Sequence, residues 1–426
     1  MSPRFPPRNA PDHHRVRISL PFYRQFGWDS TVLCISAATS DSLDDPALEA
    51  SLPPDARVVR VPAWDEAKCR RVGFGHLDYR CLVPLYNAAV ELLKREKYDV
   101  VFFSTTAFPS FLLGPILKFR FGCKVVYDFQ DPWFHGETPL YTRGTWPGKW
   151  WKLRAGQMLA RYGEALCMRA ADHVISVSDG YVSNLRARYP RMQSSDFTVL
   201  PFGVTQSDFD FIRSNNIRHR VFAAEPGRVR WVYAGRVGPD MFSILNVLFR
   251  QLALLKIGRP DFARRLDVYF VGTNYSPPER TFNVLEPLAR QHGIAGMVIE
   301  HSKRIPYFET LSLYSESDGI LLIGSDSGDY TASKLFNCVL ARKPVLALFH
   351  SESLVSQIAP RFPNVFLSSF QRTPDEPAFC DAIIRGLKWL EEARFDAATI
   401  DQLLAPWSAE QLTRDQCAIF DRLTHG

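Results

Sequence analysis

Two basic side chains in the second half of the chain stand where they could bind an anion. In the stretch 328–348, "GDYTASKLFNCVLARKPVLAL", residue types that favour helix N-caps precede an apolar pattern with helical spacing, so Lys334 falls in the first turn of a predicted helix. A cation is unfavourable there by roughly 0.3–1 kcal/mol, because the free N–H groups of the helix are already positive. An anion docked at that end would offset this cost. The alternative is a solvated lysine on a surface helix.

Arg236 is the second of these side chains, and it follows a predicted strand. The stretch 232–240, "VYAGRVGPD", is typical of a strand that runs into Gly235 and Arg236 and then into a turn. An arginine at the carboxyl end of a strand presents a planar fork that suits phosphate oxygens. The alternative is an arginine in a surface turn. Because Arg236 and Lys334 each stand at the tip of a strand–loop–helix unit, together they predict a diphosphate site.

The elements that must position these cations follow a βαβ rhythm along the whole chain. Short β-branched or aromatic runs alternate with amphipathic segments, such as those at 85–97 and 157–170, and this pattern is typical of parallel sheets covered by helices on both faces. Strands are expected at 30–36, 57–61, 99–104, 124–129, 173–178 and 197–202, and again at 229–235, 266–272, 297–301, 319–324, 344–349 and 364–369.

The fold class that this rhythm predicts is α/β, with two Rossmann-like, doubly wound domains facing a cleft. A polar, turn-rich stretch at 205–228 separates the two series of strands. We expect a first domain at 1–205, joined by a carboxyl-terminal helix at 408–426, and a second domain at 206–407. In doubly wound sheets ligands bind at the carboxyl ends of the strands, so both cations are expected in the ligand site of the second domain.

The start of the chain does not fit this pattern. A doubly wound sheet normally opens on a central strand, but the stretch 2–7, "SPRFPP", has three prolines in six residues and cannot form one. It is typical of the loop that should follow such a strand. We therefore expect the natural start to lie upstream of Met1, with a strand in the preceding segment.

Composition and charge narrow the class of partner. The chain has 51 basic and 45 acidic residues, a formal net charge of +6, which suits anionic ligands or acidic lipid head groups better than nucleic acid. No two of the eight cysteines lie within four residues, so no zinc or redox motif is predicted. The longest apolar stretch, 108–117, is interrupted by prolines and a glycine, and the first residues are polar. We expect a cytoplasmic protein.

Several motifs resemble those of a known family. The stretches "YAGR", "VYFVGT", "SDGILLIG" and "KLFNCVLARKPVLAL" resemble the carboxyl-terminal domain of GT-B glycosyltransferases of the retaining family-four type. The stretches 171–185 and 198–209 resemble that family's mid-chain signature, so the resemblance covers nearly the whole chain. It implies a nucleoside-diphosphate sugar in the second domain, an acceptor hydroxyl on a glycan, lipid-linked glycan or small molecule in the first, and hexosyl transfer with retention. It implies neither a bound metal nor a cofactor.

The resemblance also assigns donor-binding residues. Arg236 and Lys334 would neutralise the diphosphate, Asp329 would bond the sugar and Asn337 the ribose. The family usually has two glutamates where this chain has Asp329 and Asn337, and it has a lysine after "GR" that is absent here, so Lys334 would replace that lysine. The other expected donor-binding residues are Gly235, Gly272, Arg304, Ile305, Thr331 and Ser333.

On the acceptor side the resemblance directs attention to two stretches. In 127–137, "YDFQDPWFHGE", Asp131 stands at the carboxyl edge of a strand and is the first candidate for a base, with His135 second. The alternative for Asp131 is a turn cap. In 7–17, "PRNAPDHHRVR", the loop after the family's first strand would bring Asp12, His13, His14 and Arg15 to the donor and acceptor. The alternative there is a flexible terminus.

Two further stretches combine cations with aromatic residues. The stretches 143–157 and 116–124 have the composition of a surface that touches the inner face of a membrane, as a lipid-linked acceptor would require. A loop over a soluble acceptor, or ordinary packing, would explain the same residues.

Two rival functions remain at this stage. A nucleotide-sugar epimerase of the same fold would need more acid–base groups than this chain offers. A relative that binds a nucleotide sugar or a partner enzyme without turnover is favoured by Asn337. A dinucleotide dehydrogenase is disfavoured, because no Gly-x-Gly-x-x-Gly follows any candidate strand.

Overall fold

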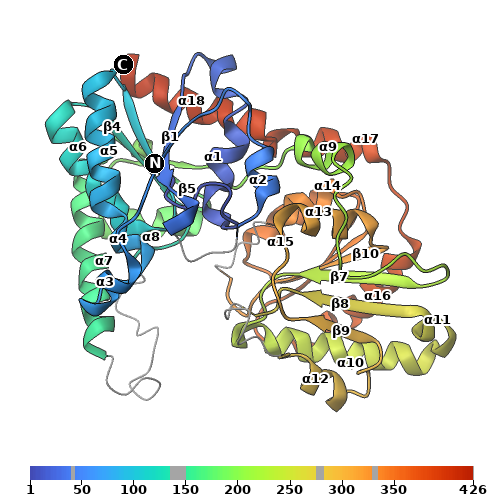
Figure 1. The fold of residues 1–426 in the computed structure, drawn as a ribbon. Coiled ribbons are helices and arrows are strands. Elements are labelled where there is room, and N and C mark those ends of the chain that lie inside the picture. Colours follow the sequence, from blue (N-terminus) through green and yellow to red (C-terminus); the bar gives the residue numbers. More distant parts are fainter. Residues whose placement is uncertain (40–43, 135–149, 275–282, 329–333, 426) are drawn as a thin grey trace. The chain divides into compact units, whose positions relative to one another are not determined.

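The computed structural model describes residues 1–39, 44–134, 150–274, 283–328 and 334–425, with no side-chain description for 150–153. The chain divides into two compact units. Unit 1 comprises Met1–Gly203 and Ala409–Gly426, and unit 2 comprises Val204–Ser408. These bounds lie one or two residues from those expected. Figure 1 shows a parallel sheet with helices packed on it in each unit.

Unit 1 contains two parallel sheets that are not hydrogen-bonded to each other. One consists of β1 (Thr31–Ile35) and β2 (Arg57–Val61). The other has the order β3-β4-β5-β6, formed by β3 (Val100–Ser104), β4 (Lys124–Phe129), β5 (His173–Ser176) and β6 (Phe197–Val199).

The helices of unit 1 cover both faces of the longer sheet. Along β4, Val125 and Tyr127 pack into a core cluster with α5 and α6, while Val126 between them packs into a second cluster with Phe420 of α18. Alternation along a strand buried on both faces produces this division. The α-helices are α1 (His14–Ser19), α2 (Pro46–Ala50), α3 (Glu66–Arg71), α4 (Leu77–Arg80), α5 (Leu82–Arg95), α6 (Leu113–Phe121), α7 (Trp150–Ala170), α8 (Asp179–Arg188) and α18 (Ala409–His425). The 3-10 helices are η1 (Pro11–His13), η2 (Tyr23–Phe26), η3 (Ala37–Thr39), η4 (Phe108–Leu112) and η5 (Ser194–Asp196).

Unit 2 is one six-stranded parallel sheet with the order β12-β11-β10-β7-β8-β9. The strands are β7 (Val229–Ala234), β8 (Leu266–Val271), β9 (Val298–His301), β10 (Gly319–Ile323), β11 (Val345–His350) and β12 (Val365–Phe370). The chain moves outward from β7 to β9, returns to β10 on the other side of β7 and continues outward again. The topological switch point, where doubly wound folds bind ligands, therefore lies between β7 and β10.

Helices lie on both faces of this sheet as well, with α10 and α12 on one face and α13 and α14 on the other (Figure 1). The α-helices are α9 (Gln206–Ser214), α10 (Phe242–Gly258), α11 (Pro260–Arg265), α12 (Glu286–Gln291), α13 (Tyr307–Glu316), α14 (Leu335–Leu340), α15 (Leu354–Ile358), α16 (Pro377–Glu392) and α17 (Ala397–Leu404). Short 3-10 helices are η6 (Pro239–Met241), η8 (Ala359–Arg361) and η9 (Ala405–Trp407).

The most apolar helix is a core element. Within the described residues one helical segment, Pro239–Gly258, has the length and composition to cross a membrane, with a mean hydropathy of 1.4. Its residues Ile244, Leu248 and Leu252 are fully buried in the core of unit 2.

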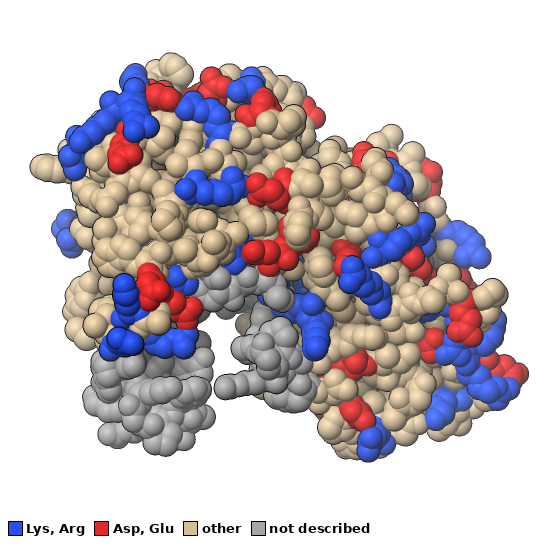
Figure 2. All heavy atoms as spheres, viewed as in Figure 1, with Lys and Arg blue, Asp and Glu red and all other residues tan. Residues whose placement is uncertain are grey.

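Basic and acidic side chains are interspersed over the face seen in Figure 2, where no large area of one sign appears.

The end of β10 gives a test of packing in unit 2. A Cβ at Gly324 would lie 2.5 Å from Cδ1 of Phe349, which is fully buried. We expect Gly324→Ala to destabilise unit 2 by about 1–3 kcal/mol, because a buried ring cannot move without disturbing its neighbours. The urea-unfolding midpoint measures this. Gly258→Ala is the matched control: no atom lies within 4 Å of its added Cβ, so its midpoint should stay or rise. Equal midpoints for both variants would contradict the prediction.

Candidate functional site

The carboxyl end of β7, next to the switch point, is built around a residue without a side chain. The N–H of Gly235 continues the ladder to β8 by donating to the carbonyl of Val271 at 2.8 Å. A Cβ on Gly235 would lie 2.2 Å from Nζ of Lys334 and 2.9 Å from the hydroxyl of Tyr233. Glycine therefore leaves the space in which Lys334 reaches over the end of the strand.

Lys334 is held above the strand by the backbone. Its Nζ donates to the carbonyl of Ala234 at 2.8 Å and lies 5.9 Å from the centroid of the Tyr233 ring. Lys334 occupies the N-cap position of α14, which begins at Leu335, and so precedes the first turn in which it was expected. Burial, and to a smaller extent the positive charges of Arg304 and Arg236, lower the pKa of Lys334 to about 8. Three cations thus act on one another at this sheet edge.

Arg236 is already oriented by a carboxylate. Its Nη1 and Nη2 donate to Oδ1 and Oδ2 of Asp240 at 2.8 and 2.7 Å, in the bidentate geometry of strong arginine pairs. This pairing lowers the pKa of Asp240. The carbonyl of Arg236 accepts a hydrogen bond from the Tyr233 hydroxyl at 2.5 Å. Both cations predicted for the diphosphate therefore stand at the end of β7, and Asp240 is a partner that the sequence analysis did not identify.

The loop after β8 adds to the same edge. Gly272 has a φ of 72°, and its missing Cβ would lie 3.6 Å from Cα of Arg304, so these two predicted residues pack against each other. Glu300 fixes this region: it accepts from Thr273 Oγ1 at 2.5 Å and from the N–H of Leu285 at 2.8 Å. Glu300 thus has a structural role that could not be predicted from the sequence, because its partners are distant along the chain.

The remaining predicted donor-binding residues are not among the contacts of Lys334 and Arg236 given above, or they lie outside the described residues. Ile305 is half-buried just before α13, and Asn337 is half-buried within α14. Asp329, Thr331 and Ser333 lie outside the described residues.

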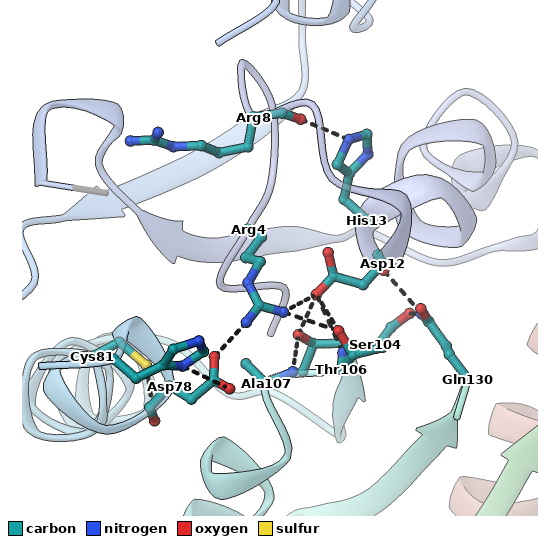
Figure 3. A network of polar contacts seen from close by, with 12 residues as sticks. Arg4, Arg8, Asp12, His13, Asp78, Cys81, Ser104, Thr106, Ala107 and Gln130 are labelled. Carbon is teal, nitrogen blue, oxygen red and sulfur yellow. Dashed lines mark hydrogen bonds and ion pairs between the residues drawn. The ribbon is translucent and has the colours of Figure 1, made fainter. Parts of the chain in front are cut away.

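In unit 1 a buried carboxylate organises the loops at the end of β3 (Figure 3). Oδ2 of Asp12 accepts from the hydroxyl of Thr105 at 2.8 Å and from the N–H of Thr106 at 3.2 Å. Arg4 bridges Asp12, at 3.3 Å, and Asp78, at 2.5 Å. Oδ1 of Asp12 is buried with no partner in the described part of the chain. Arg4 and Asp78 were missed because 74 residues separate them.

A second network connects the amino-terminal helix to β4. Nε of Arg15 and Oγ of Ser104 each donate to Oδ2 of Asp128 at 2.8 Å. Arg15 also donates to the carbonyl of Leu200 at 2.6 Å, and Gln130 donates to Oγ of Ser104 at 2.9 Å. Arg15, expected on the acceptor side, is thus a buried residue that holds several strand ends together.

Asp131 is the predicted acceptor-side residue whose chemistry suits a base. Its residue is exposed at the end of β4, yet nearby protein partly desolvates the carboxyl and, together with the charge of Asp12, raises its pKa to about 6. A carboxyl group with a pKa near neutrality can exchange protons with a reacting group.

The predicted histidines are placed differently from one another. His13 is buried, its Nε2 lies 2.9 Å from the carbonyl of Arg8, and burial holds its pKa well below the usual range. His14 is half-buried with Nε2 3.3 Å from the carbonyl of Gly203. His135 lies outside the described residues.

Residues 23–203 match the family model of the glycosyl transferase 4-like domain. Most of unit 1 is therefore similar to a glycosyl transferase 4-like domain. The match includes all six strands of unit 1 and the side chains of Ser104, Asp128 and Gln130. Arg4, Asp12 and Arg15 lie before it. No curated protein matches the sequence.

Solved structures are similar to the chain over nearly its whole length. Sucrose-phosphate synthase from Thermosynechococcus elongatus has a TM-score of 0.59 at 14% identity, covering 96% of this chain and 92% of that one. HepE from Anabaena, in complex with UDP and glucose, has 0.53 at 14%, covering 95% and 97%. A putative UDP-N-acetylglucosamine 2-epimerase from Listeria monocytogenes has 0.53 at 12%, covering 100% and 96%.

At these identities the likeness shows the fold. The likeness confirms the predicted fold class, with two Rossmann-like domains, and the family model supports the resemblance over residues 23–203.

The desolvated amine of Lys334 predicts a pH-dependent stability. Its native pKa of about 8 lies below the ordinary value of 10.5, so between these pH values the unfolded chain binds a proton that the native protein does not. The native protein therefore gains stability as pH rises through this window. We expect Lys334→Met to be more stable than the unchanged protein at pH 7, and the gap to shrink by pH 10.

Urea midpoints at both pH values measure that gap. Lys388→Met, at an exposed position of α16, serves as the control and should show a constant difference. A constant gap for Lys334→Met would refute the desolvation of its amine.

Proposed function

We propose that this protein transfers a hexosyl group from a nucleoside-diphosphate sugar to an acceptor hydroxyl, with retention of stereochemistry. The observation that carries the proposal is the position of Lys334 and Arg236 at the switch-point end of β7, where burial of the amine, together with repulsion from Arg304 and Arg236, lowers the pKa of Lys334. A diphosphate bound there would relieve that repulsion. The GT-B fold and the glycosyl transferase 4-like domain support this reaction class.

The cations would act on the leaving group. As the bond from the anomeric carbon to the β-phosphate oxygen breaks, negative charge grows on the diphosphate, and pre-positioned cations stabilise it. The anomeric carbon then bonds to the acceptor oxygen. The hydroxyl proton passes to the leaving phosphate or to a carboxylate, for which Asp131 is our candidate. Binding of the diphosphate would also raise the pKa of Lys334 and keep its amine protonated at neutral pH.

Two alternative functions compete with this proposal. An epimerase is supported by the likeness to the putative epimerase, and a binding protein without turnover is supported by Asn337 in place of a glutamate. Incubation with a panel of nucleotide sugars separates the three. A transferase releases free sugar slowly without an acceptor, an epimerase yields the epimeric nucleotide sugar, and a binding protein yields no product.

We further propose that the acceptor is lipid-linked and that unit 1 touches the inner face of a membrane, as in cytoplasmic polysaccharide biosynthesis. Helices α6 and α7 pack against each other, and each exposes large apolar side chains. Phe119 is 94% exposed and Tyr162 64%, with Arg120 and Arg161 beside them in sequence. Apolar side chains flanked by cations suit an anionic lipid surface.

Binding of UDP tests the diphosphate site. A charge-assisted hydrogen bond contributes about 1.5–3 kcal/mol, so Lys334→Met should weaken UDP binding by roughly 10- to 100-fold. Lys334→Arg should retain it. Affinity of the unchanged protein should fall as pH rises above about 8, while the Lys334→Arg variant, which stays charged, should show a flatter profile. Titration calorimetry measures both, with Lys388→Met as control. Equal affinity of Lys334→Met and the unchanged protein would exclude this site.

Sedimentation with phosphatidylglycerol vesicles tests the membrane proposal. Burying a phenylalanine contributes about 1.5–3 kcal/mol, so Phe119→Ser should lower the vesicle partition coefficient roughly tenfold or more. Ile257→Ser is the control, because Ile257 is 78% exposed but lies on α10 of unit 2. The same loss in both variants, or in neither, would argue against a contact through α6 and α7.

A further inference from the structure

The carboxyl end of β11 carries a hydrogen-bond donor next to an acceptor. The strand ends at His350, and Glu352 follows two residues later, before α15 begins at Leu354. Nδ1 of His350 accepts the N–H of Glu352 at 3.2 Å, so the neutral ring has its proton on Nε2. In the described part of the chain, neither this Nε2–H nor the carboxylate of Glu352 has a hydrogen bond or an ion pair.

A glycine in the segment after β10 packs against both side chains. A Cβ on Gly328 would lie 3.2 Å from Nδ1 of His350 and 3.2 Å from Oε2 of Glu352. On its other side the imidazole meets the ring of Phe370 edge to face, with centroids 5.3 Å apart. The histidine ring is therefore oriented by the fold. Since His350 is half-buried and Glu352 is exposed, both side chains remain open to a ligand.

The position of this pair in the sheet relates it to the cations at the end of β7. The order β11-β10-β7 places the ends of β11 and β7 two strand spacings apart, roughly 10 Å. Lys334 reaches over the end of β7 and Arg236 follows that strand. A diphosphate bound there would have β10 and β11 on one side and β8 on the other. A group joined to that diphosphate could therefore extend along the sheet edge to His350 and Glu352.

The chemistry of the pair suits a group with several hydroxyls. A hydroxyl both donates and accepts, so an N–H and a carboxylate side by side can bind two neighbouring hydroxyls. A further phosphate would be repelled by Glu352. An aromatic base gains much of its binding from stacking on an apolar or aromatic face. Within the described residues, none of the exposed large apolar side chains belongs to 350–358, so no such face stands beside the pair.

We propose that His350 and Glu352 bind hydroxyl groups of the sugar in the nucleoside-diphosphate sugar and so determine which sugar the protein accepts. Nε2–H of His350 donates to one hydroxyl oxygen, and the carboxylate of Glu352 accepts from a neighbouring hydroxyl. An epimer that directs a hydroxyl elsewhere would leave one of these groups unpaired, and such a mismatch discriminates strongly. The inference rests on the proposed function, because it requires a diphosphate at Lys334 and Arg236.

Titration calorimetry with paired ligands tests this inference. The ligands are UDP with UDP-glucose, UDP-galactose and UDP-N-acetylglucosamine, and GDP with GDP-mannose. The measured quantity is the dissociation constant of each nucleotide sugar divided by that of its nucleoside diphosphate. For the sugar that binds best, Glu352→Ala should raise this ratio roughly 10- to 100-fold and His350→Ala about 3- to 10-fold. The affinity for UDP or GDP alone should not change.

Two further variants separate recognition from a structural role. His350→Gln should restore most of the affinity that His350→Ala loses, because the glutamine side chain also offers an N–H donor. Glu392→Ala is the matched control for Glu352→Ala, since Glu392 is an exposed carboxylate on α16, and it should leave the ratio unchanged.

The outcomes distinguish failure of this inference from failure of the proposed function. If neither UDP nor GDP binds the unchanged protein, the diphosphate site and the inference are both wrong. If one of them binds but the ratio stays constant in both alanine variants, or no nucleotide sugar of the panel binds, only the sugar site is refuted. Weaker binding of UDP or GDP itself by these variants would also overturn the inference, because the pair would then contact the nucleotide.

Discussion

The hydrogen bond from Lys334 to the carbonyl of Ala234 is the contact on which the candidate site of unit 2 depends. It joins the helix that follows β10 to the end of β7, and these strands are neighbours because the sheet reverses its order there. It also favours glycine at position 235, since a Cβ there would lie 2.2 Å from the ammonium nitrogen. Strand order, a glycine and a desolvated amine are therefore parts of one arrangement. It buries an amine close to two arginines, and this is the reason for expecting an anion.

Unit 1 relies on a different device, buried charge that is paired within the fold. Arg15 with Asp128, and Arg4 with Asp12 and Asp78, connect segments that are far apart in the sequence. Removing one partner of a buried pair is costly because the other charge is left in a medium of low polarity. Such pairs fix where each loop leaves its strand. The exposed Asp131 stands next to this fixed framework.

Much of the fold could be predicted from the sequence, and the reason is physical. Strands buried on both faces are nearly continuous apolar runs, so a strand is found in every predicted range from β1 to β12. The sequence also predicted that Arg236 and Lys334 lie close together. Both follow strands of one doubly wound sheet, and ligands bind at the carboxyl ends of such strands. The ends of helices were harder to predict. Before α14, several residue types in 329–333 are suited to an N-cap, so the sequence did not define the first residue of the helix. The apolar run in α10 was overlooked since a charged residue interrupts it.

Partners of the site residues were the least predictable part. Asp240 lies four residues from Arg236, but only the turn at Gly238 brings their side chains into a bidentate pair. Glu300 and Asp78 have no local signal at all. A site residue can be recognised by its type and its place at a strand end. The atoms that restrain it come from whatever the fold brings near.

The pair formed by Arg236 and Asp240 has a consequence for how an anion would enter. The guanidinium is immobilised before any ligand arrives, so the loss of side-chain entropy that usually opposes recognition has already occurred. An incoming phosphate would either bind the guanidinium of Arg236 together with the carboxylate of Asp240 or displace that carboxylate. The N–H of Asp326 donates to the carbonyl of Asp240 at 2.9 Å, so the turn that holds this carboxylate is also joined to the segment that follows β10.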